Sequence, residues 1–258
     1  MGTADVNGPL WGARVRDYAA LIEPQFRPAY DRVFGELALK RGDSLLDVGC
    51  GPALATHVAA QMGASVSGLD ASELSLEVAR ERTPQGDFRP GDIEAVPWFD
   101  DSFDVVTGFN AFQFASDIVG ALREARRVAR PGGKVSMLVW GLDEDCESQV
   151  TVGAVRRLMP PPPGPTEPAP LGSEGRVEQL MSEAGLKPLD SGNVTCEWEF
   201  PDLETAVRGF RSAGVMVAAG KQLGEEKVQT TVRESLRQFQ RDGRIVQKND
   251  YRYVIAEA

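Results

Sequence analysis

One short segment near the start of the chain limits the possible folds more than any other. Residues 45–53 read Leu-Leu-Asp-Val-Gly-Cys-Gly-Pro-Ala, and a helix-forming stretch follows at 53–62. An apolar strand that runs into an Asp, a Gly-x-Gly turn and a helix is how α/β proteins present backbone N–H groups to nucleotide-like ligands. The segment therefore predicts an α/β fold with a nucleoside site at this turn.

The spacing of the glycines argues against a dinucleotide site. A dinucleotide fingerprint has the pattern G-x-G-x-x-G. Counted from Gly49, the third glycine position is occupied by Leu54. An NAD-binding oxidoreductase is therefore the less favoured alternative.

The same segment resembles motif I of the class I S-adenosylmethionine (SAM) dependent methyltransferases, in which an acidic residue precedes a G-x-G turn. Asp47, Gly49 and Gly51 match this motif, and Ala53 stands where the third small residue of the family varies. The resemblance implies that Asp47 holds the turn and the ammonium end of the cofactor. It also places Cys50 inside the cofactor loop.

Further motifs follow in register with the first. A predicted strand at 64–69 ends in Asp70, about twenty residues after the turn, where doubly wound folds place the carboxylate that accepts from the ribose hydroxyls. Ala71 follows it. Asp92 and Ile93 resemble the adenine site of the family, in which a carboxylate accepts from the exocyclic amine and an apolar side chain lies against the base.

Two more matches complete the resemblance, which extends across residues 44–140. Residues 101–110 are similar to the fourth strand of the family, and its end, Asn110, lies where the family contacts the cofactor near the reacting methyl. Residues 124–133 match the helix and Pro-Gly-Gly turn before the fifth strand. The chain is most similar to the methyltransferase type 11 group, which includes quinone-biosynthesis enzymes and many natural-product enzymes. This implies SAM as cofactor and S-adenosylhomocysteine as product.

Strands and helices are expected to alternate through the first half of the chain. Strands are predicted near 44–49, 64–69, 86–90, 103–109 and 134–140, with helices near 53–62, 72–82 and 117–129 between them. This alternation predicts a parallel sheet buried on both faces. With the resemblance, it predicts one Rossmann-like domain over 1–258, with a seven-stranded, mostly parallel sheet.

The flanking regions are expected to cover the SAM-binding core at 41–140. Residues 1–40 are predicted to form an N-terminal helical lid. The C-terminal half, 141–258, is predicted to contain a proline-dense loop at 159–170, a helix at 173–184, a strand at 194–200, inserted cap helices at 203–219 and 225–240, and an antiparallel closing strand at 251–256.

No residue stands out as a catalytic base. Methyl transfer is an in-line displacement, so the protein mainly positions and desolvates the reactants, although a carbon or hydroxyl nucleophile also needs a base. Tyr18 is a weak candidate for that base, and Asn110 and Gln113 are weak candidates that would orient a polar substrate group. His57, the single histidine, is predicted to lie beside an apolar helix stripe that faces the sheet.

Aromatic side chains predict the class of methyl acceptor. Phe109, Gln113 and Phe114 follow strand four at the mouth of the sheet, where ligands of this fold collect. Trp140, at the end of strand five, would either stack on a flat substrate or close the core. With the apolar side chains of the inserted helices, these residues favour an apolar or aromatic small molecule. A SAM-binding cyclase or pericyclase without methyl transfer stays open, because no base is evident.

The composition limits the partners of the chain. Its 38 acidic and 28 basic residues give a net charge of -10, which argues against nucleic acid. Four basic residues with helical spacing predict a solvated helix face: Arg123, Arg126, Arg127 and Arg130. No run approaches the ~20 apolar residues of a membrane span. A cytoplasmic protein without a catalytic metal is expected, and a homodimer is one option for its assembly.

Overall fold

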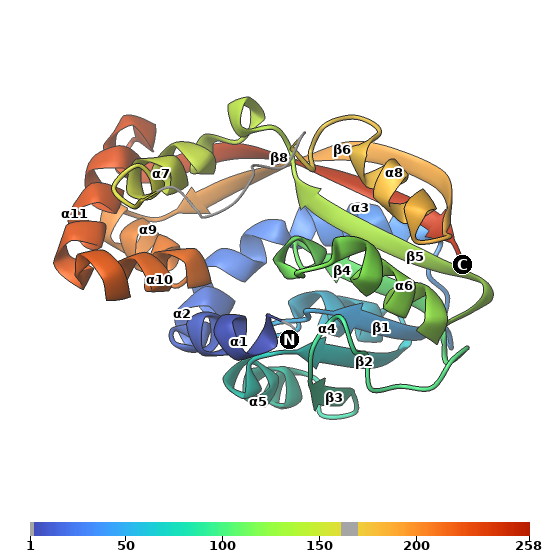
Figure 1. Cartoon of the computed structure of the whole chain (residues 1–258). Helices are drawn as coiled ribbons and strands as arrows, with labels where there is room; N and C mark the ends of the chain where they lie inside the picture. Colours follow the sequence, from blue (N-terminus) through green and yellow to red (C-terminus); the bar gives the residue numbers. More distant parts are fainter. Residues whose placement is uncertain (1–2, 161–169) are drawn as a thin grey trace.

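The structure, a computed structural model, describes residues 3–160 and 170–258 and has one mixed sheet at its centre (Figure 1). Its strands are β1 (Ser44–Val48), β2 (Ser65–Asp70), β3 (Asp87–Pro90), β4 (Phe103–Phe109), β5 (Ala129–Trp140), β6 (Lys187–Phe200), β7 (Gln240–Arg241) and β8 (Arg244–Glu257). The order is β3-β2-β1-β4-β5-β8-β6, with β7 paired to β8. Strands β1 to β5 pair in parallel, whereas β8 is antiparallel to both β5 and β6.

This arrangement confirms the Rossmann-like α/β fold and corrects the strand count from seven to eight. The additional strand, β7, forms a hairpin with β8 through Asp242 and Gly243, both of which have positive φ. A two-residue turn of this kind matches the twist of the flanking strands, and Asp-Gly is a common sequence for it.

Helices cover both faces of the sheet, as predicted. The flanking helices are α3 (Arg27–Leu37), α4 (Leu54–Gln61), α5 (Glu73–Arg82), α6 (Ile118–Val128) and α8 (Arg176–Glu183). Leu45 and Leu46 of β1 are both fully buried but point to opposite faces. Leu45 belongs to the core cluster that contains residues of α3 and α4, and Leu46 to the cluster that contains residues of α6 and α8. The apolar run of β1 therefore reflects burial on both sides.

The N-terminal segment is helical, as expected, but is broken into short pieces. They are α1 (Ala4–Gly12), α2 (Val15–Asp17), the π-helical turn η1 (Tyr18–Ile22) and the 3-10 turn η2 (Glu23–Phe26), which leads into α3. Pro24 and Pro28 lie at the first turns of η2 and α3, where a missing N–H is tolerated. In Figure 1, α1 lies beside α5 and α10 rather than against the sheet.

The C-terminal half differs most from expectation. An unpredicted helix, α7 (Glu147–Arg156), follows β5 and the short turn η4 (Asp143–Asp145). The helix expected at 203–219 is two helices, α9 (Leu203–Phe210) and α10 (Gly214–Leu223), and α11 (Glu225–Leu236) is followed by the turn η5 (Arg237–Phe239). The proline-dense segment lies almost wholly outside the described residues.

Both C-terminal strands are longer than the sequence suggested. Strand β8 begins at Arg244 rather than near residue 251. In its first half Gln247 and Asn249 are fully buried and alternate with the exposed Lys248 and the partly buried Asp250. Polar side chains in buried positions hide the period-2 pattern that marks a strand. Within the described ranges no helix has the length and apolar character needed to cross a membrane.

Candidate functional site

The loop between β1 and α4 turns sharply at the carboxyl edge of the sheet. Gly49, Gly51 and Ala53 have φ values of 71°, 54° and 63°. A Cβ atom on Gly49 would lie 2.5 Å from Cβ of Ala111, in the loop after β4. Glycine is therefore required at Gly49 both for its backbone conformation and for close packing. The turn leaves Gly49 and Gly51 on the wall of a cavity of about 360 Å³.

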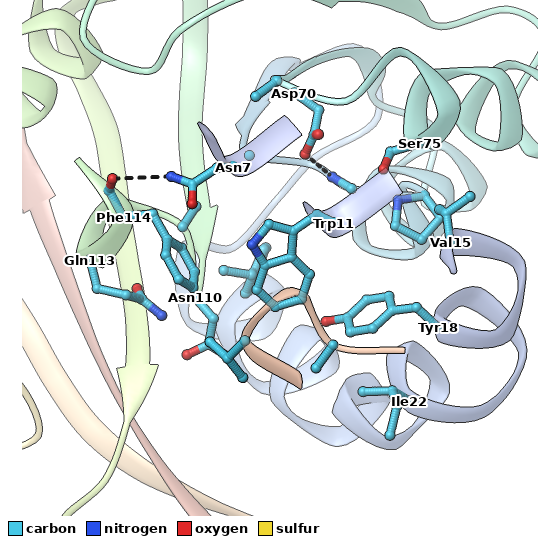
Figure 2. Close-up of a pocket in the computed structure, with 18 of the residues that line it drawn as sticks. Asn7, Trp11, Val15, Tyr18, Ile22, Asp70, Ser75, Asn110, Gln113 and Phe114 are labelled. Atoms are coloured by element: carbon cyan, nitrogen blue, oxygen red, sulfur yellow. Dashed lines mark hydrogen bonds between the residues drawn. The ribbon is translucent and has the colours of Figure 1, made fainter. Parts of the chain in front are cut away.

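Asp70 ends β2 next to this turn and also lines the cavity. Its Oδ2 accepts a hydrogen bond from the Gly51 N–H at 2.8 Å, the dashed line at Asp70 in Figure 2. Its Oδ1 accepts from the Ser72 N–H, also at 2.8 Å. Burial raises the pKa of the Asp70 carboxyl, and these two N–H donors oppose that rise. A carboxylate has about four acceptor sites, so Asp70 can still accept from hydroxyls in the cavity.

The loop after β3 brings Asp92 and Ile93 to the same end of the cavity. Asp92 Oδ1 accepts from the Glu94 N–H at 2.9 Å, and its Oδ2 accepts from the N–H of Ala4, the first residue of α1, at 3.3 Å. This loop is therefore tied to the N-terminal segment.

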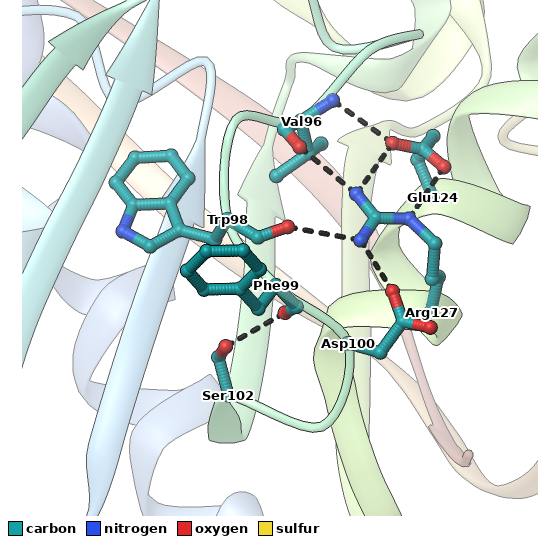
Figure 3. A network of polar contacts seen from close by, with 7 residues as sticks. All are labelled: Val96, Trp98, Phe99, Asp100, Ser102, Glu124 and Arg127. Atoms are coloured by element: carbon teal, nitrogen blue, oxygen red, sulfur yellow. Dashed lines mark hydrogen bonds and ion pairs between the residues drawn. The ribbon is translucent and has the colours of Figure 1, made fainter.

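Arg127 of α6 fixes the continuation of that loop (Figure 3). Its guanidinium donates to the carbonyl oxygens of Val96 and Trp98, each at 2.9 Å, and to the carboxylates of Asp100 and Glu124 at 2.8 Å. Glu124 in turn accepts from the Val96 N–H at 2.9 Å. Of the four basic residues expected on a solvated face, Arg127 is thus an anchor, because its side chain is partly buried among these acceptors.

Helix α1 forms the opposite wall of the cavity. Gly8 packs directly on the loop after β2, since a Cβ there would lie 2.4 Å from the carbonyl oxygen of Ala71. Thr3 Oγ1 donates to the Phe114 carbonyl at 2.5 Å. Figure 2 shows that Trp11 and Tyr18 face the loop after β4. The rings of Trp11 and Phe114 are in edge contact, with their centroids 5.5 Å apart.

Aromatic rings line the other end of the cavity. Tyr30 lies 4.8 Å from Phe109, and Phe26 lies 5.4 Å from Trp198 and 6.0 Å from Trp140, measured between ring centroids. The inserted C-terminal helices and the segment between them complete this aromatic end with Phe210, Ala213, Val215 and Met216, and α7 adds Ser148, Gln149, Val152 and Arg156.

Seven of the nine predicted cofactor residues line the cavity: Gly49, Gly51, Asp70, Ala71, Asp92, Ile93 and Asn110. Asp47 and Cys50 are not on its wall. Asp47 Oδ1 instead accepts from Thr107 Oγ1 of β4 at 2.7 Å, and burial raises the pKa of Asp47 to about 7. The thiol of Cys50 is buried in a small cluster with Leu76 and Phe88.

The predicted substrate residues Phe109, Gln113, Phe114 and Trp140 all line the cavity, and so does Tyr18. Asn110, with φ of 53°, and Gln113 each bury an amide oxygen that has no hydrogen-bond partner among the described residues. Burial raises the pKa of Tyr18, and the negative charge of Glu23 raises it further.

His57 lies away from the cavity. Its ring nitrogens are 3.0 Å from Thr83 Oγ1 and 3.1 Å from Gln61 Nε2. The stripe predicted to face the sheet next to it consists of Leu54, Val58 and Met62, and this prediction was partly wrong, because Met62 is 40% exposed. Ala55, Val58 and Ala59 form the buried face of α4 instead.

Glu23, a buried carboxylate next to the glycine turn, was not expected from the sequence. Its Oε1 accepts from the Leu54 N–H at 2.7 Å, and its Oε2 pairs with Arg82 at 2.6 Å. Burial raises the pKa of Glu23 to about 7, although Arg82 acts in the opposite direction. An acidic residue between Ile22 and Pro24 was the only signal, and it did not reveal the partner.

Comparison with known proteins agrees with this geometry. A family model described as a methyltransferase domain matches residues 46–137. The chain is 33% identical over 204 residues to the malonyl-(acyl-carrier protein) O-methyltransferase of Erwinia pyrifoliae, which covers 79% of this chain and 74% of that protein. It is also 33% identical over 214 residues to the 27-O-demethylrifamycin SV methyltransferase of Amycolatopsis mediterranei, covering 74% and 73%.

The fold is similar to that of a methyltransferase solved in complex with the Haloferax volcanii Trm112 methyltransferase activator. The TM-score is 0.62 at 19% identity, and the match covers 98% of this chain and 96% of that one.

Proposed function

The chain belongs to the class I SAM-dependent methyltransferases, and from this premise we propose that it methylates a flat, apolar or aromatic small molecule bound in the aromatic end of the cavity. One observation carries the proposal: a single cavity extends from Gly49 and Asp70 to Trp140 and Trp198. Cofactor and acceptor would therefore be in contact inside one cavity of the protein. The names of both curated relatives indicate transfer to oxygen, which supports an oxygen acceptor here.

The residues at the end of the cavity that contains the glycine turn, here called the cofactor end, suit the cofactor. Asp70 has acceptor sites left for the ribose hydroxyls, and Asp92 with Ile93 would hold the base. The turn at Gly49 and Gly51, which has left-handed backbone conformation, leaves the space between Asp70 and Asp92 free of side chains from these two positions. When bound, SAM supplies a methyl group already activated by a sulfonium.

The protein would act mainly through orientation and exclusion of water. Of the described residues at the aromatic end, none is a carboxylate or a histidine, and the raised pKa of Tyr18 keeps its hydroxyl protonated. The unpaired amide oxygens of Asn110 and Gln113 would accept a hydrogen bond from the acceptor and set its angle. Holding the reactants in line in a dry cavity accounts for a large part of such catalysis.

In the same proposal, residues 1–40 are the lid and 141–258 supply the cap of one domain. The contacts of Ala4, Gly8 and Trp11 with the cofactor loops and α10 support this division. The absence of a nucleic-acid partner, a homodimeric assembly and a cytoplasmic location stay predictions from composition.

The test is to incubate the purified protein with SAM and a panel of phenols, naphthols and aromatic acids, and to read product masses. An acceptor that gains the mass of one methylene, together with formation of S-adenosylhomocysteine, supports the proposal. A substrate that changes structure without a change of mass indicates the cyclase alternative.

A further inference from the structure

Arg156 is the only basic side chain among the described residues that line the cavity. Among these described lining residues, the other charged side chains are Asp70 and Asp92, and both lie at the cofactor end. Two arginines of the cap helices have glutamate partners: Arg211 pairs with Glu225 and Arg233 with Glu204. Arg156 pairs with no described residue, so its guanidinium remains available to a ligand.

Helix α7 presents Arg156 on the same face as two other lining residues, Ser148 and Val152. These three are spaced by four positions, which places them on one side of a helix. At 1.5 Å per residue, Ser148 and Arg156 are about 12 Å apart along the axis. Ser148 is buried next to β8, where its N–H donates to Asn249 Oδ1, and Arg156 is exposed at the other end of α7. In Figure 1, α7 lies beside α11, and it also contacts α10.

Two further donors at this end have no partner. Trp198 is 3% exposed and Ser148 1% exposed, and both line the cavity. Neither Trp198 Nε1 nor Ser148 Oγ has a hydrogen-bond partner in the described part of the chain. An indole N–H and a guanidinium can only donate, so this wall is suited to oxygen atoms of a ligand. A buried donor without a partner is costly, which makes a matching acceptor favourable.

We propose that the methyl acceptor is an organic acid: its flat body packs between the aromatic rings, its anionic group binds Arg156, and a neutral oxygen accepts from Trp198 or Ser148. This inference rests on the proposed function and narrows its substrate class. In a chain of net charge -10, a local cation is needed to offset repulsion of such a ligand.

Two probes that differ in one charged group test this directly. 1-Anilinonaphthalene-8-sulfonate is an aromatic anion, and N-phenyl-1-naphthylamine has the same rings without the sulfonate. Fluorescence titrations of both would be made on the full chain saturated with S-adenosylhomocysteine, as wild type, Arg156→Gln, Arg156→Lys and Arg157→Gln. Arg157 is the matched control, because it is the adjacent exposed arginine and does not line the cavity.

We expect the wild type to prefer the anion by about tenfold, as one charge-assisted contact provides. Arg156→Gln should lose that preference while still binding the neutral probe, Arg156→Lys should retain part of it, and Arg157→Gln should match the wild type. Equal binding of the probes by wild type, or an unchanged preference in Arg156→Gln, overturns the inference. Calorimetry with S-adenosylhomocysteine on the same samples separates the two proposals: a wild type that binds S-adenosylhomocysteine but shows no preference for the anion contradicts this inference and leaves the proposed function standing.

Discussion

The carboxylate of Glu23 accepts a hydrogen bond from the guanidinium of Arg82 at 2.6 Å, directly below the cofactor loop. Both side chains also reach the backbone of that loop: Glu23 accepts from the Leu54 N–H, and Arg82 donates to the Pro52 carbonyl at 2.7 Å. An ion pair between the N-terminal segment and α5 thus holds the loop from two sides.

Replacing Glu23 with Ala should destabilise the fold and weaken cofactor binding. The change leaves the Leu54 N–H and part of the Arg82 charge buried without a partner, which costs about 2–3 kcal/mol of unfolding free energy. Urea unfolding and calorimetry with S-adenosylhomocysteine would measure the two effects. Arg16→Gln, which breaks the exposed pair with Glu81, should leave both unchanged.

Stability should fall as the pH rises from about 4.5 to about 7. Burial raises the pKa values of Glu23 and Asp47 to about 7, so the native state keeps protons that the unfolded state releases near the ordinary carboxyl values. Each unit by which the pH rises in this window therefore lowers the free energy of unfolding through these two groups. The double change Glu23→Gln with Asp47→Asn should flatten the trend in urea midpoints, and an identical slope in this variant would contradict the assignment.

Asp70→Ala should weaken binding of S-adenosylhomocysteine by about 1–3 kcal/mol, because the ribose hydroxyls and the Gly51 and Ser72 N–H groups lose their acceptor. Glu73→Ala is the control, since Glu73 is exposed on α5 and pairs with Arg80 at the surface. Unchanged affinity in Asp70→Ala would rule out the ribose role.

Arg127→Leu should loosen the loop after Ile93. The carbonyl oxygens of Val96 and Trp98 lose their donor, so amide hydrogen exchange at 94–100 should become faster and cofactor affinity should fall. Arg126→Leu removes an exposed arginine of the same helix and should do neither. Equal exchange in the two variants would show that Arg127 does not fix this loop.

Gly8→Ala should hold α1 away from the cofactor loop, because its Cβ would lie 2.4 Å from the Ala71 carbonyl oxygen. Stopped-flow measurement should show faster dissociation of S-adenosylhomocysteine. Gly35→Ala, in the last turn of α3 with open space around it, should instead stabilise the protein by about 0.5–1 kcal/mol. Slower or unchanged dissociation in Gly8→Ala would show that α1 does not retain the cofactor.

The cofactor end could be predicted from sequence because its residues belong to short motifs. Gly49 follows the apolar strand β1, Asp70 ends β2 and Asp92 follows the short polar strand β3, and parallel strands bring their carboxyl ends together. The local sequence pattern at each strand end therefore also determines where these residues lie in the folded protein.

Only part of the aromatic end could be predicted in the same way. Ser148 comes from α7, a helix that was not expected, and Trp198 lies beside Trp140 because β8 pairs with both β5 and β6. The Glu23–Arg82 pair spans 59 positions, and no local pattern records such a contact. The positions of these residues depend on strand pairing and ion pairing between segments that are far apart in the sequence.

Helix α1 touches both ends of the cavity at once: Ala4 and Gly8 contact the cofactor loops, while Trp11 packs against Gly214 of α10 and Phe114. A rigid helix cannot leave one of these surfaces and stay seated on the other. If α1 acts as the proposed lid, entry of the cofactor and entry of the acceptor would therefore be coupled through one short helix.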